Sequence, residues 1–418
     1  MMITLVSAPP LSHRLAEEMA RIDTLNPYSD RVCTAEETVS RMRRRFREFG
    51  ITRLAETTGL DCIGLPVWAA VRPNALTLSV CQGKGITDAA AQASAIMEAA
   101  EVATAERSDL PLRTASLDDL VREGHACHVL ESLIRRGKAN PARDERITWL
   151  EGFDLLTGIA VFVPSEAVTL DHTAIESRYW RSTDGLASGN LLVEAVLHGL
   201  CERVERDACS LWLLRSDAEV RRRCLDPLAF EDEALTALTA QIARAGMHLR
   251  LFDITTNVGV PVFFATVSPA PDTDMAKWKH FDLASGSGCH PLPARAAIRA
   301  VTEAVQSRLT LISGARDDFD PDLYAAKLKP DLLAYVHARP ADQRPRQAEP
   351  LSRGQYIPFI LDRLRAVGAR HAIAVPLEAE AEGFAVAKVL VPDLENPPGS
   401  DRRQPFGRRG LAAMMGVL

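Results

Sequence analysis

Three segments of the chain share one pattern, in which a short stretch rich in glycine and serine leads into an alanine-rich helix that carries acids. They are CQGKGITDAAAQASAIMEAAE (81–101), STDGLASGNLLVEAVLHGLCERVERDA (182–208) and ASGSGCHPLPARAAIRAVTEAVQSR (284–308). Their sequences differ, so the shared feature is architectural and does not indicate a solenoid. Small residues before a helix expose backbone N–H groups and the positive end of the helix dipole, which suits anions. We therefore expect three turns that open onto three helices.

The second segment places three carboxylates on one side of its predicted helix. At about 100° per residue, Glu194, His198, Glu202 and Glu205 fall within a stripe roughly 80° wide. Apolar residues flank these acids and fill most of the remaining circle. Such a stripe fits either a cleft that holds a cation or an ordinary solvated face, and the helix alone favours neither. Asn190, at the mouth of the helix, is either an N-cap or a donor to a phosphate or a metal-bound water.

The first segment carries another pair of acids and a turn lysine. Glu98 and Glu101 are three residues apart and share a helix face, with Ser94 one turn earlier. Lys84 in the GKG sequence is either a phosphate contact or an exposed turn lysine. The P-loop pattern GxxxxGKS or GxxxxGKT is not present, so nucleotide binding by a P-loop is not indicated. Five carboxylates on two helices are too many for a simple acid/base pair, and they fit several Mg²⁺ ions that hold a polyphosphate.

Composition is that of an ordinary globular chain. The 418 residues are 47% hydrophobic and 25% charged, and the net charge of −6 disfavours broad nucleic-acid binding. No apolar run is long enough to span a bilayer, and the N-terminal sequence lacks the pattern of a signal peptide. The eight cysteines are scattered without a CxxC pair, which is typical of reduced thiols. We therefore expect a cytoplasmic protein that binds neither nucleic acid nor membrane.

The order of predicted elements indicates a mixed α/β (α+β) fold, with β-sheets flanked by helices. Residues 1–60 are expected to form a helical N-terminal extension, and residues 61–418 one large core domain. Within the extension, Thr34 and Glu37 have capping-box spacing and Gly50 ends the helix. Strands are predicted at 158–170, 249–255, 260–268 and 384–392, and exposed loops at 135–146 and 339–355.

The motifs of the first two segments resemble those of the YcaO proteins, ATP-dependent enzymes that modify peptide backbones. The resemblance runs from about Leu60 to the C-terminal region and implies that residues 61–418 are a YcaO-type ATP-binding catalytic domain. The family signature Ser-x-x-x-Glu-x-x-Glu-Arg is matched at Ser94, Glu98 and Glu101, but Val102 replaces the arginine. The signature Asn-x-x-x-Glu with a later Glu-x-x-Glu pair is matched completely, at Asn190, Glu194, Glu202 and Glu205.

The resemblance also implies binding residues outside these two signatures. A third signature, a glutamine shortly followed by an arginine, is matched approximately by Gln306 with Arg308, and Arg316 is the other arginine nearby. A basic residue near the N-terminus contacts nucleotide in such proteins, and Arg31 is its counterpart here. No catalytic side chain is assigned. ATP is thus expected to contact Arg31, Lys84, Ser94, Asn190, Gln306 and Arg308, and Mg²⁺ to be bound by Glu98, Glu101, Glu194, Glu202 and Glu205.

The chemistry of the family implies the activity of this chain. A nucleophile adds to a backbone amide carbon, the amide oxygen takes a phosphoryl group from ATP, and phosphate then leaves. An internal Cys, Ser or Thr gives an azoline, external sulfide gives a thioamide, and an amine gives an amidine. The terminal sequence GRRGLAAMMGVL is no Pro-x-Pro-x-Pro tail, and TEAVQSRLTLISGARDD looks like members that pair with a TfuA protein. We therefore favour thioamidation of a ribosomally made peptide or protein, with a TfuA-like sulfur-delivery partner, over azoline formation.

Two other classes of function are alternatives to such an enzyme. A non-catalytic ATP-binding accessory protein would explain Val102, although the chain keeps all five glutamates. A nucleotide-free metallohydrolase is disfavoured because no histidine-rich ligand set is present. A homodimer is expected only by analogy with the family.

Overall fold

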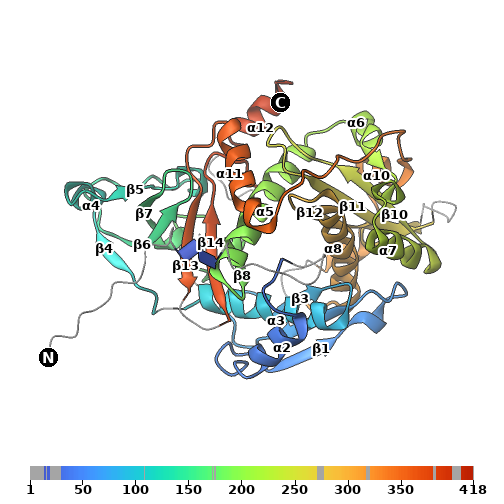
Figure 1. Ribbon diagram of the computed structural model, residues 1–418, viewed down its shortest axis with the longest axis horizontal. Helices are drawn as coiled ribbons and strands as arrows, with labels where there is room; N and C mark the ends of the chain where they lie inside the picture. The colour runs from blue at the N-terminus through green and yellow to red at the C-terminus, as the bar shows by residue number, and fades with distance from the viewer. Residues whose placement is uncertain are drawn as a thin grey trace.

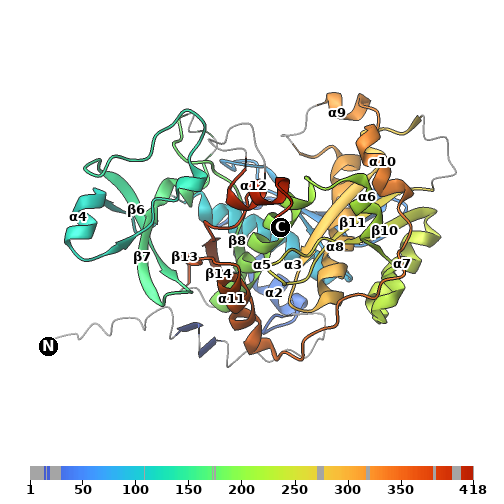
Figure 2. The ribbon, with the colours of Figure 1, turned by 90° about the horizontal axis from the view of Figure 1, so that it is seen from above.

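The computed structural model describes residues 14–15, 17–18, 30–107, 109–171, 173, 176–270, 277–316, 321–379, 383–397 and 406–417. Among these residues, three sheets surround a set of long helices, which confirms the predicted mixed α/β fold (Figure 1). Figure 2 shows β6 and β7 at one end of the molecule, β10 and α7 at the other, and α3 and α5 between them. Within the described residues, no helix has both the length and the apolar character that a membrane crossing requires.

The strands form three sheets. The first has the order β1-β2-β3, with β1 Arg53–Glu56, β2 Val67–Val71 and β3 Val80–Lys84. The second has the order β12-β11-β10-β9, with β9 Cys224–Leu225, β10 Met247–Asp253, β11 Val262–Pro269 and β12 Ala284–Cys289. The third has the order β5-β7-β6-β13-β14-β8, with β4 added on β6. Its strands are β4 Arg113–Ala115, β5 Ala126–Cys127, β6 Ile147–Asp154, β7 Ile159–Pro164, β8 Leu186–Gly189, β13 Ile373–Glu378 and β14 Ala385–Leu390.

The helices cover and connect these sheets. Three of them are long and lie at the centre, namely α3 Asp88–Ala105, α5 Leu192–Trp212 and α8 Pro293–Ser313. The others are α2 Ala35–Arg43, α4 Leu117–Arg122, α6 Asp217–Arg222, α7 Glu233–Arg244, α9 Asp322–Ala325, α10 Leu333–His337, α11 Tyr356–Ala366 and α12 Arg408–Met414.

Most elements with a clear local signal are where the sequence predicted them. β7, β10, β11 and β14 overlap the four predicted strands, and the two predicted loops are irregular apart from short turns and the 3₁₀ helix Arg353–Gln355. Thr34 and Glu37 form the expected capping box at the beginning of α2, because each side chain accepts a hydrogen bond from the backbone N–H of the other.

The chain before residue 60, predicted to be mostly helical, also contains a strand that the sequence did not indicate. β1 is an edge strand that pairs antiparallel with β2, with Arg53 opposite Val71, so the first sheet crosses the expected boundary between residues 60 and 61. Four residues give too short an alternation to be read as a strand from sequence. Most of residues 1–29 lie outside the described residues, and the division of the chain into 1–60 and 61–418 stays a prediction.

The three glycine-rich stretches are strands, and the prediction that they are turns was wrong. They form β3, β8 and β12, each of which leads directly into one of the three long helices. A Cβ atom on Gly83, Gly189 or Gly286 would lie under 3.0 Å from the backbone of the helix that follows. Glycine occurs in these strands because the helix packs closely against them, and not because a turn requires it.

The three strand–helix units contact one another in a ring. α3 packs on β3 and also contacts β8, α5 packs on β8 and also contacts β12, and α8 packs on β12 and also contacts β3. Each long helix buries its apolar side in a separate hydrophobic cluster. The ring therefore brings the three long helices together near the centre of the molecule (Figure 1).

Candidate active site

Five glutamates from the three long helices are close enough to influence one another electrostatically. Glu98 and Glu101 come from α3, Glu202 and Glu205 from α5, and Glu303 from α8. Burial, and to a smaller extent the neighbouring carboxylates of the cluster, raise the pKa of Glu98 and of Glu205 to about 7. Burial and the charges of Glu98 and Glu202 also raise the pKa of Glu101. The surface of the Glu98 side chain is accessible whereas Glu101 and Glu205 are buried, so solvent reaches the cluster from the side of Glu98, although the protein around Glu98 withdraws it from bulk water enough to raise its pKa.

Residues on β3 and β12 orient two of these acids. Lys84, the last residue of β3, forms a 3.0 Å ion pair with Glu303. On β12, Ser287 donates a 2.7 Å hydrogen bond from Oγ to Glu205 and a 3.3 Å bond from its backbone N–H to Glu303. Although burial raises the pKa of Glu303, the charges of Lys84 and Arg206 outweigh this effect and lower it. Glu303 is therefore a carboxylate already paired with cations.

Glu202 is held from the opposite side by groups near the third sheet. The backbone N–H of Gly185 donates a 3.1 Å hydrogen bond to it. Arg206, on the next turn of α5, bonds to Glu202 at 3.2 Å and to Asp184 at 3.1 Å. Lys388 on β14 is buried, and burial lowers its pKa to about 8 although Asp184 and Glu202 act in the opposite direction. Glu202 is thus the member of the glutamate cluster that lies next to Asp184, Arg206 and Lys388.

This donor set suits Mg²⁺ that is shared with phosphate groups. Mg²⁺ prefers hard oxygen ligands and usually binds one or two carboxylates together with substrate phosphates. Among the residues described, no three His, Cys, Asp or Glu side chains already converge enough to hold a metal ion. Carboxylates that raise one another's pKa are stabilised in their charged form when a cation lies between them. The residues therefore fit ions held jointly by glutamates and a polyphosphate.

Glu194, also predicted to bind metal, lies with the N-terminal segment of the described chain. It accepts a 3.1 Å hydrogen bond from Arg31 Nη1 and a 2.7 Å bond from the backbone N–H of Val32. The backbone N–H of Asn190 donates to the same carboxylate at 2.8 Å. Arg31 therefore neutralises Glu194 in this structure, and both the metal role of Glu194 and the nucleotide contact of Arg31 stay predictions.

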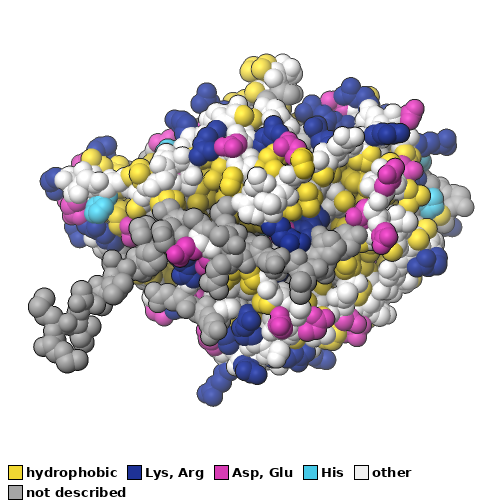
Figure 3. All heavy atoms as spheres, in the orientation of Figure 1, with side chains coloured by type: hydrophobic (Ala, Val, Ile, Leu, Met, Phe, Trp, Pro, Cys, Tyr) yellow, Lys and Arg dark blue, Asp and Glu magenta, His cyan; other side chains and the backbone are white. Residues whose placement is uncertain are grey.

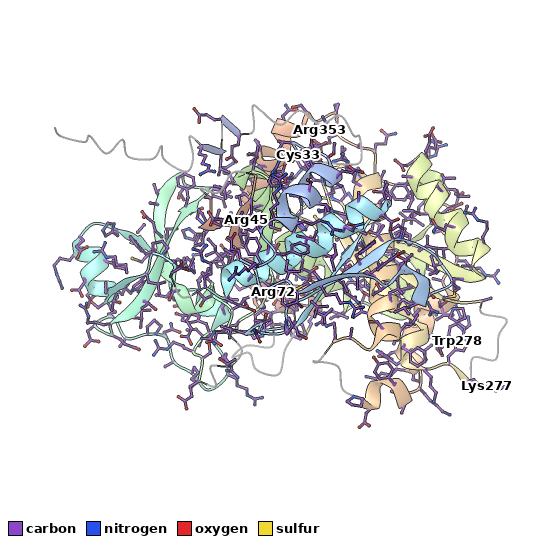
Figure 4. All side chains as sticks on the ribbon, turned by 90° about the horizontal axis from the view of Figure 1, so that it is seen from below. Cys33, Arg45, Arg72, Lys277, Trp278 and Arg353 are labelled. Atoms are coloured by element: carbon purple, nitrogen blue, oxygen red, sulfur yellow. The ribbon has the colours of Figure 1, made fainter. Side chains whose placement is uncertain are left out.

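Asn190 attaches α2 to α5 and does not cap α5, so the capping interpretation was wrong. The N-cap of α5 is Leu191. The side-chain oxygen of Asn190 accepts hydrogen bonds from Thr38 Oγ1 at 3.0 Å and from Arg41 Nη1 at 3.3 Å. Cys33, in this N-terminal segment, lies beside α2 (Figure 4). The nucleotide contact of Asn190 stays a prediction.

Cations surround His198, one turn before Glu202 on α5. Its pKa is lowered well below the usual value, first by burial and then by the charges of Arg299, Arg31 and Lys84. Figure 3 shows a group of Lys and Arg side chains on the face of the molecule over α5, β12 and α8. The centre of the molecule therefore offers cations that suit phosphate oxygens beside carboxylates that suit Mg²⁺.

Gln306 and Ser94 lie at different places relative to the cluster. Gln306 Nε2 donates a 2.6 Å hydrogen bond to the backbone carbonyl of Gln82, which joins α8 to β3. Ser94 is half-buried on α3, one turn before Glu98. The nucleotide contacts predicted for Gln306 and Ser94 stay predictions.

Of the two arginines considered for the third signature, Arg316 lies nearer the acids. Arg308 forms a 3.0 Å ion pair with Asp61, whose side chain is 1% exposed. Arg316 is close enough to Glu98 to lower its pKa. Arg308 is thus already paired with the buried carboxylate of Asp61, whereas the charge of Arg316 lowers the pKa of Glu98 in the cluster.

Several residues of the site were not predicted from the sequence. Glu303 had a signal, because it lies in the third glycine-rich unit at a position equivalent to Ser94. A Cβ on Gly83 would meet Ser94 and its neighbours, and a Cβ on Gly286 would meet Glu303 in the same way. Others depend on contacts between distant segments, which no local spacing reveals. They are Asp184, Ser287, Arg299 and Lys388, whereas Arg206 had a local signal because it lies four residues after Glu202 on α5.

We expect Mg²⁺-dependent nucleotide binding to strengthen as the pH rises from about 6 to about 8. Glu98 and Glu205 have pKa values raised to about 7, first by burial, and a metal ion must displace their protons below that pH. The stabilisation of the protein by MgATP, measured as the shift in its thermal unfolding midpoint, should therefore increase over this range.

Without Mg²⁺, the raised pKa values of Glu98 and Glu205 make the folded protein less stable as the pH rises. A carboxyl group with a raised pKa binds more protons in the folded chain than in the unfolded chain, so its contribution falls as the pH rises from about 4.5 to about 7. The wild type should lose stability over this range relative to a Glu205→Gln variant. A MgATP-induced shift that is independent of pH would contradict the assignment.

Replacing Lys84 with methionine is expected to weaken nucleotide affinity about tenfold, the value for loss of one charged hydrogen bond. Its ion pair with Glu303 is partly exposed, with 27% and 29% of the side chains accessible, and such a pair contributes only about 0–1 kcal/mol to stability. Titration with a fluorescent ATP analogue measures the affinity, and the exposed Lys329→Met is the control. Unchanged affinity would leave Lys84 as a structural partner of Glu303.

Comparison with known proteins identifies the family. A family model described as YcaO cyclodehydratase, binding ATP and Mg²⁺, matches residues 82–395. A protein from the tfuA 3′ region of Rhizobium leguminosarum bv. trifolii is 42% identical over 380 residues, which is 89% of this chain and 90% of the relative. A protein from Methanothermobacter thermautotrophicus is 33% identical over 375 residues, which is 86% of this chain and 93% of the relative.

Two solved structures share the fold. YcaO from Methanopyrus kandleri, bound with AMPPCP and Mg²⁺, has a TM-score of 0.68 at 23% identity, over 92% of this chain and 100% of that one. A heterocyclase in complex with substrate and cofactor has a TM-score of 0.73 at 20% identity, over 97% of this chain. The present chain spans only 58% of that heterocyclase. At these identities the likeness concerns the fold alone.

Proposed function

The chain belongs to the YcaO family of ATP- and Mg²⁺-binding proteins, and from this premise we propose that it converts a backbone amide of a peptide or protein into a thioamide. One observation carries the proposal, namely the meeting of glutamates from α3, α5 and α8 beside a group of cations. When bound, MgATP would supply the phosphoryl group that makes the amide oxygen a good leaving group.

The residues of the chain would contribute position and charge. Glu101, Glu202 and Glu205 are held on long helices that pack against strands, so their carboxylates stay in place during the reaction. Lys84 and Arg206 are fixed by ion pairs at the margins of the cluster. Preorganised charges of this kind stabilise developing charge without reorganising, which is often a large part of catalysis.

Similarity to a protein in a tfuA 3′ region supports thioamide formation over azoline formation. At 42% identity over most of both chains, the two proteins are similar enough to suggest a shared partner. We propose that a TfuA-like protein delivers sulfide to this chain, and that a ribosomally made peptide or protein supplies the amide. The azoline-forming reaction is the alternative, since it uses the same phosphorylation chemistry.

Mass spectrometry of modified peptides separates these reactions. The purified chain, a TfuA-like protein, MgATP and sulfide are added to a lysate of cells that lack the corresponding gene, and the peptides are then compared. Thioamidation replaces one oxygen by sulfur, whereas azoline formation removes one water at Cys, Ser or Thr. ATP-dependent exchange of oxygen for sulfur that is absent with Glu202→Gln is the expected result.

Loss of water in place of sulfur gain would contradict thioamidation and favour the azoline reaction. Tight MgATP binding without any mass change in the lysate peptides would favour a non-catalytic accessory protein.

A further inference from the structure

The back of α5 carries two buried charged residues that lie outside the glutamate cluster. Arg203 and Asp207 are one turn apart and are 3% and 0% exposed. At about 100° per residue, Asp207 lies about 140° from Glu202 and about 160° from Glu205 around the helix. The carboxylate of Asp207 therefore points away from the two glutamates. A charge buried to this degree requires partners that compensate for the lost water.

The partners of both residues come from the last part of the chain. Arg409, in α12, donates from Nε and Nη2 to the two oxygens of Asp207 at 2.6 and 2.8 Å. The backbone N–H of Glu395 donates a further 2.8 Å bond to the same carboxylate. Arg203 donates from Nη2 to the backbone carbonyl of Glu395 at 3.1 Å and to Asn396 Oδ1 at 2.8 Å. Two parallel bonds between a planar guanidinium and a carboxylate fix orientation as well as distance.

α12 is held mainly by polar bonds. It contacts α5 near the C-terminal end of the chain (Figure 1), and Gly410 is the one buried residue among its seven. Leu411 and Met414 of the same helix are 51% and 52% exposed, so apolar burial contributes little to its attachment. The carboxylate of Glu395 accepts hydrogen bonds from the backbone N–H groups of Gly407 at 2.6 Å and of Gly410 at 2.8 Å. α12 therefore contributes directed bonds to α5 rather than a hydrophobic core.

Small rotations of α5 matter for a bound metal ion. Side-chain ends lie about 6 Å from a helix axis, so turning α5 by about 10° moves the carboxylates of Glu202 and Glu205 by about 1 Å. Mg²⁺ requires near-ideal octahedral geometry at short distances, whereas Ca²⁺ accepts longer and more variable arrangements. Bonds that fix the rotation of α5 therefore affect the binding of Mg²⁺ more than that of Ca²⁺.

We propose that Arg409 is a positioning residue, which fixes the rotation of α5 through Asp207 and so places Glu202 and Glu205 for Mg²⁺. The inference rests on the proposed function, because it concerns the metal-binding glutamates of the same site. A buried ion pair adds little net stability when compared with apolar packing, so its main effect is on the position of α5.

Nucleotide affinity in two metals tests this proposal on the intact chain. Arg409→Lys keeps a charge for Asp207 but cannot form two parallel bonds. A fluorescent ATP analogue is titrated into the wild type and the variant, in Mg²⁺ and separately in Ca²⁺. We expect the affinity in Mg²⁺ to fall about tenfold, the lower end of the loss when a partner that orients metal ligands is removed. The affinity in Ca²⁺ should fall less than about threefold. Arg408→Lys, at an exposed position of the same helix, should change neither affinity.

A second variant tests whether Arg409 acts through Asp207. Asp207→Asn keeps the shape and one acceptor oxygen but removes the charge of the side chain. Like Arg409→Lys, it should lower the affinity in Mg²⁺ more than that in Ca²⁺. The double variant should lose no more affinity than the more affected single variant. Additive losses would overturn the proposal, because the two residues would then act independently.

The outcomes separate the positioning role from stability and from the proposed function. Equal losses of affinity in both metals, which destabilisation of the fold alone would cause, would overturn the proposal, and so would an unchanged affinity in Mg²⁺. A wild-type chain without metal-dependent nucleotide binding would contradict the proposed function. Metal-dependent binding with the same ratio of Mg²⁺ to Ca²⁺ affinity in the wild type and in Arg409→Lys would contradict the positioning role alone.

Discussion

Replacing Glu202 with glutamine is expected to reduce Mg²⁺-dependent ATP affinity by about 100-fold or more. Loss of a carboxylate that stabilises a bound metal ion costs several kcal/mol, and each 1.4 kcal/mol is about a tenfold change in affinity. Glutamine has the same shape but only one carbonyl oxygen, so it keeps either the hydrogen bond from the N–H of Gly185 or that from the guanidinium of Arg206, which bond to different oxygens of Glu202. Titration with a fluorescent ATP analogue in Mg²⁺ measures the affinity.

The Glu202→Gln variant should fold with a stability close to that of the wild type without ligand, because removing a disfavoured buried charge offsets the lost hydrogen bond. Burial and the charge of Asp184 raise the pKa of Glu202, so the charged form is disfavoured where it lies. Thermal unfolding without nucleotide measures this effect, and the exposed Glu36→Gln is the matched control for both measurements. A variant that is destabilised and also fails to bind would show a structural role for Glu202, and unchanged binding would exclude Glu202 from the metal site.

Replacing Gly83 with alanine is expected to destabilise the protein by about 3 kcal/mol and to abolish nucleotide binding. The new Cβ would lie under 3.0 Å from backbone atoms of Ala91 and Ala95, so α3 must move away from β3. Because α3 carries Glu98 and Glu101, the carboxylate cluster would be displaced with it. Chemical denaturation measures the free energy of unfolding, and calorimetry measures the binding.

Gly59→Ala is the control for this substitution. A Cβ on Gly59 would have no neighbour within 4 Å, and its φ angle is ordinary, so the same change should cost little there. If Gly83→Ala were as stable as Gly59→Ala, the close packing of α3 on β3 could not explain the glycine in this strand.

The helical part of the site could be predicted from sequence because helix periodicity is local. The positions of Glu202 and Glu205 on one stripe follow from their spacing alone, and both do face the other acids. Glu194 shares the stripe but lies two turns away, where the N-terminal segment supplies Arg31 as its partner. Periodicity specifies a face of the helix, and the elements packed against that face decide what each acid contacts.

The strands that carry the site could not be predicted in the same way. β12 is rich in glycine and serine, β8 contains one of each, and β3 contains Gly83 and is followed by Gly85, and both residue types ordinarily indicate turns. They are strands because each pairs with a neighbour and supports a long helix on its glycines. Tertiary packing overrides local propensity here. By contrast, the predicted strands at β7 and β11 are rich in Val and Phe and were found correctly.

The arginine that the family signature places after Glu101 has a structural counterpart elsewhere. Val102 is buried in the hydrophobic cluster around α3, so its side chain packs where an arginine would need a partner. Arg206 follows Glu205 on α5 with the same spacing, and it bonds to Glu202 and Asp184. A guanidinium is therefore present beside the acids although the first signature lacks it.

Calorimetric titration of ATP into the wild-type chain, with and without Mg²⁺, tests the central claim most directly. The claim is that the glutamates of α3, α5 and α8 bind the nucleotide through Mg²⁺ while neighbouring cations contact its phosphates. We predict tight binding in Mg²⁺ and a loss of at least about 100-fold in affinity when the metal is chelated. Equal affinity with and without Mg²⁺ would contradict the claim, because the carboxylates would then have no role in holding the nucleotide.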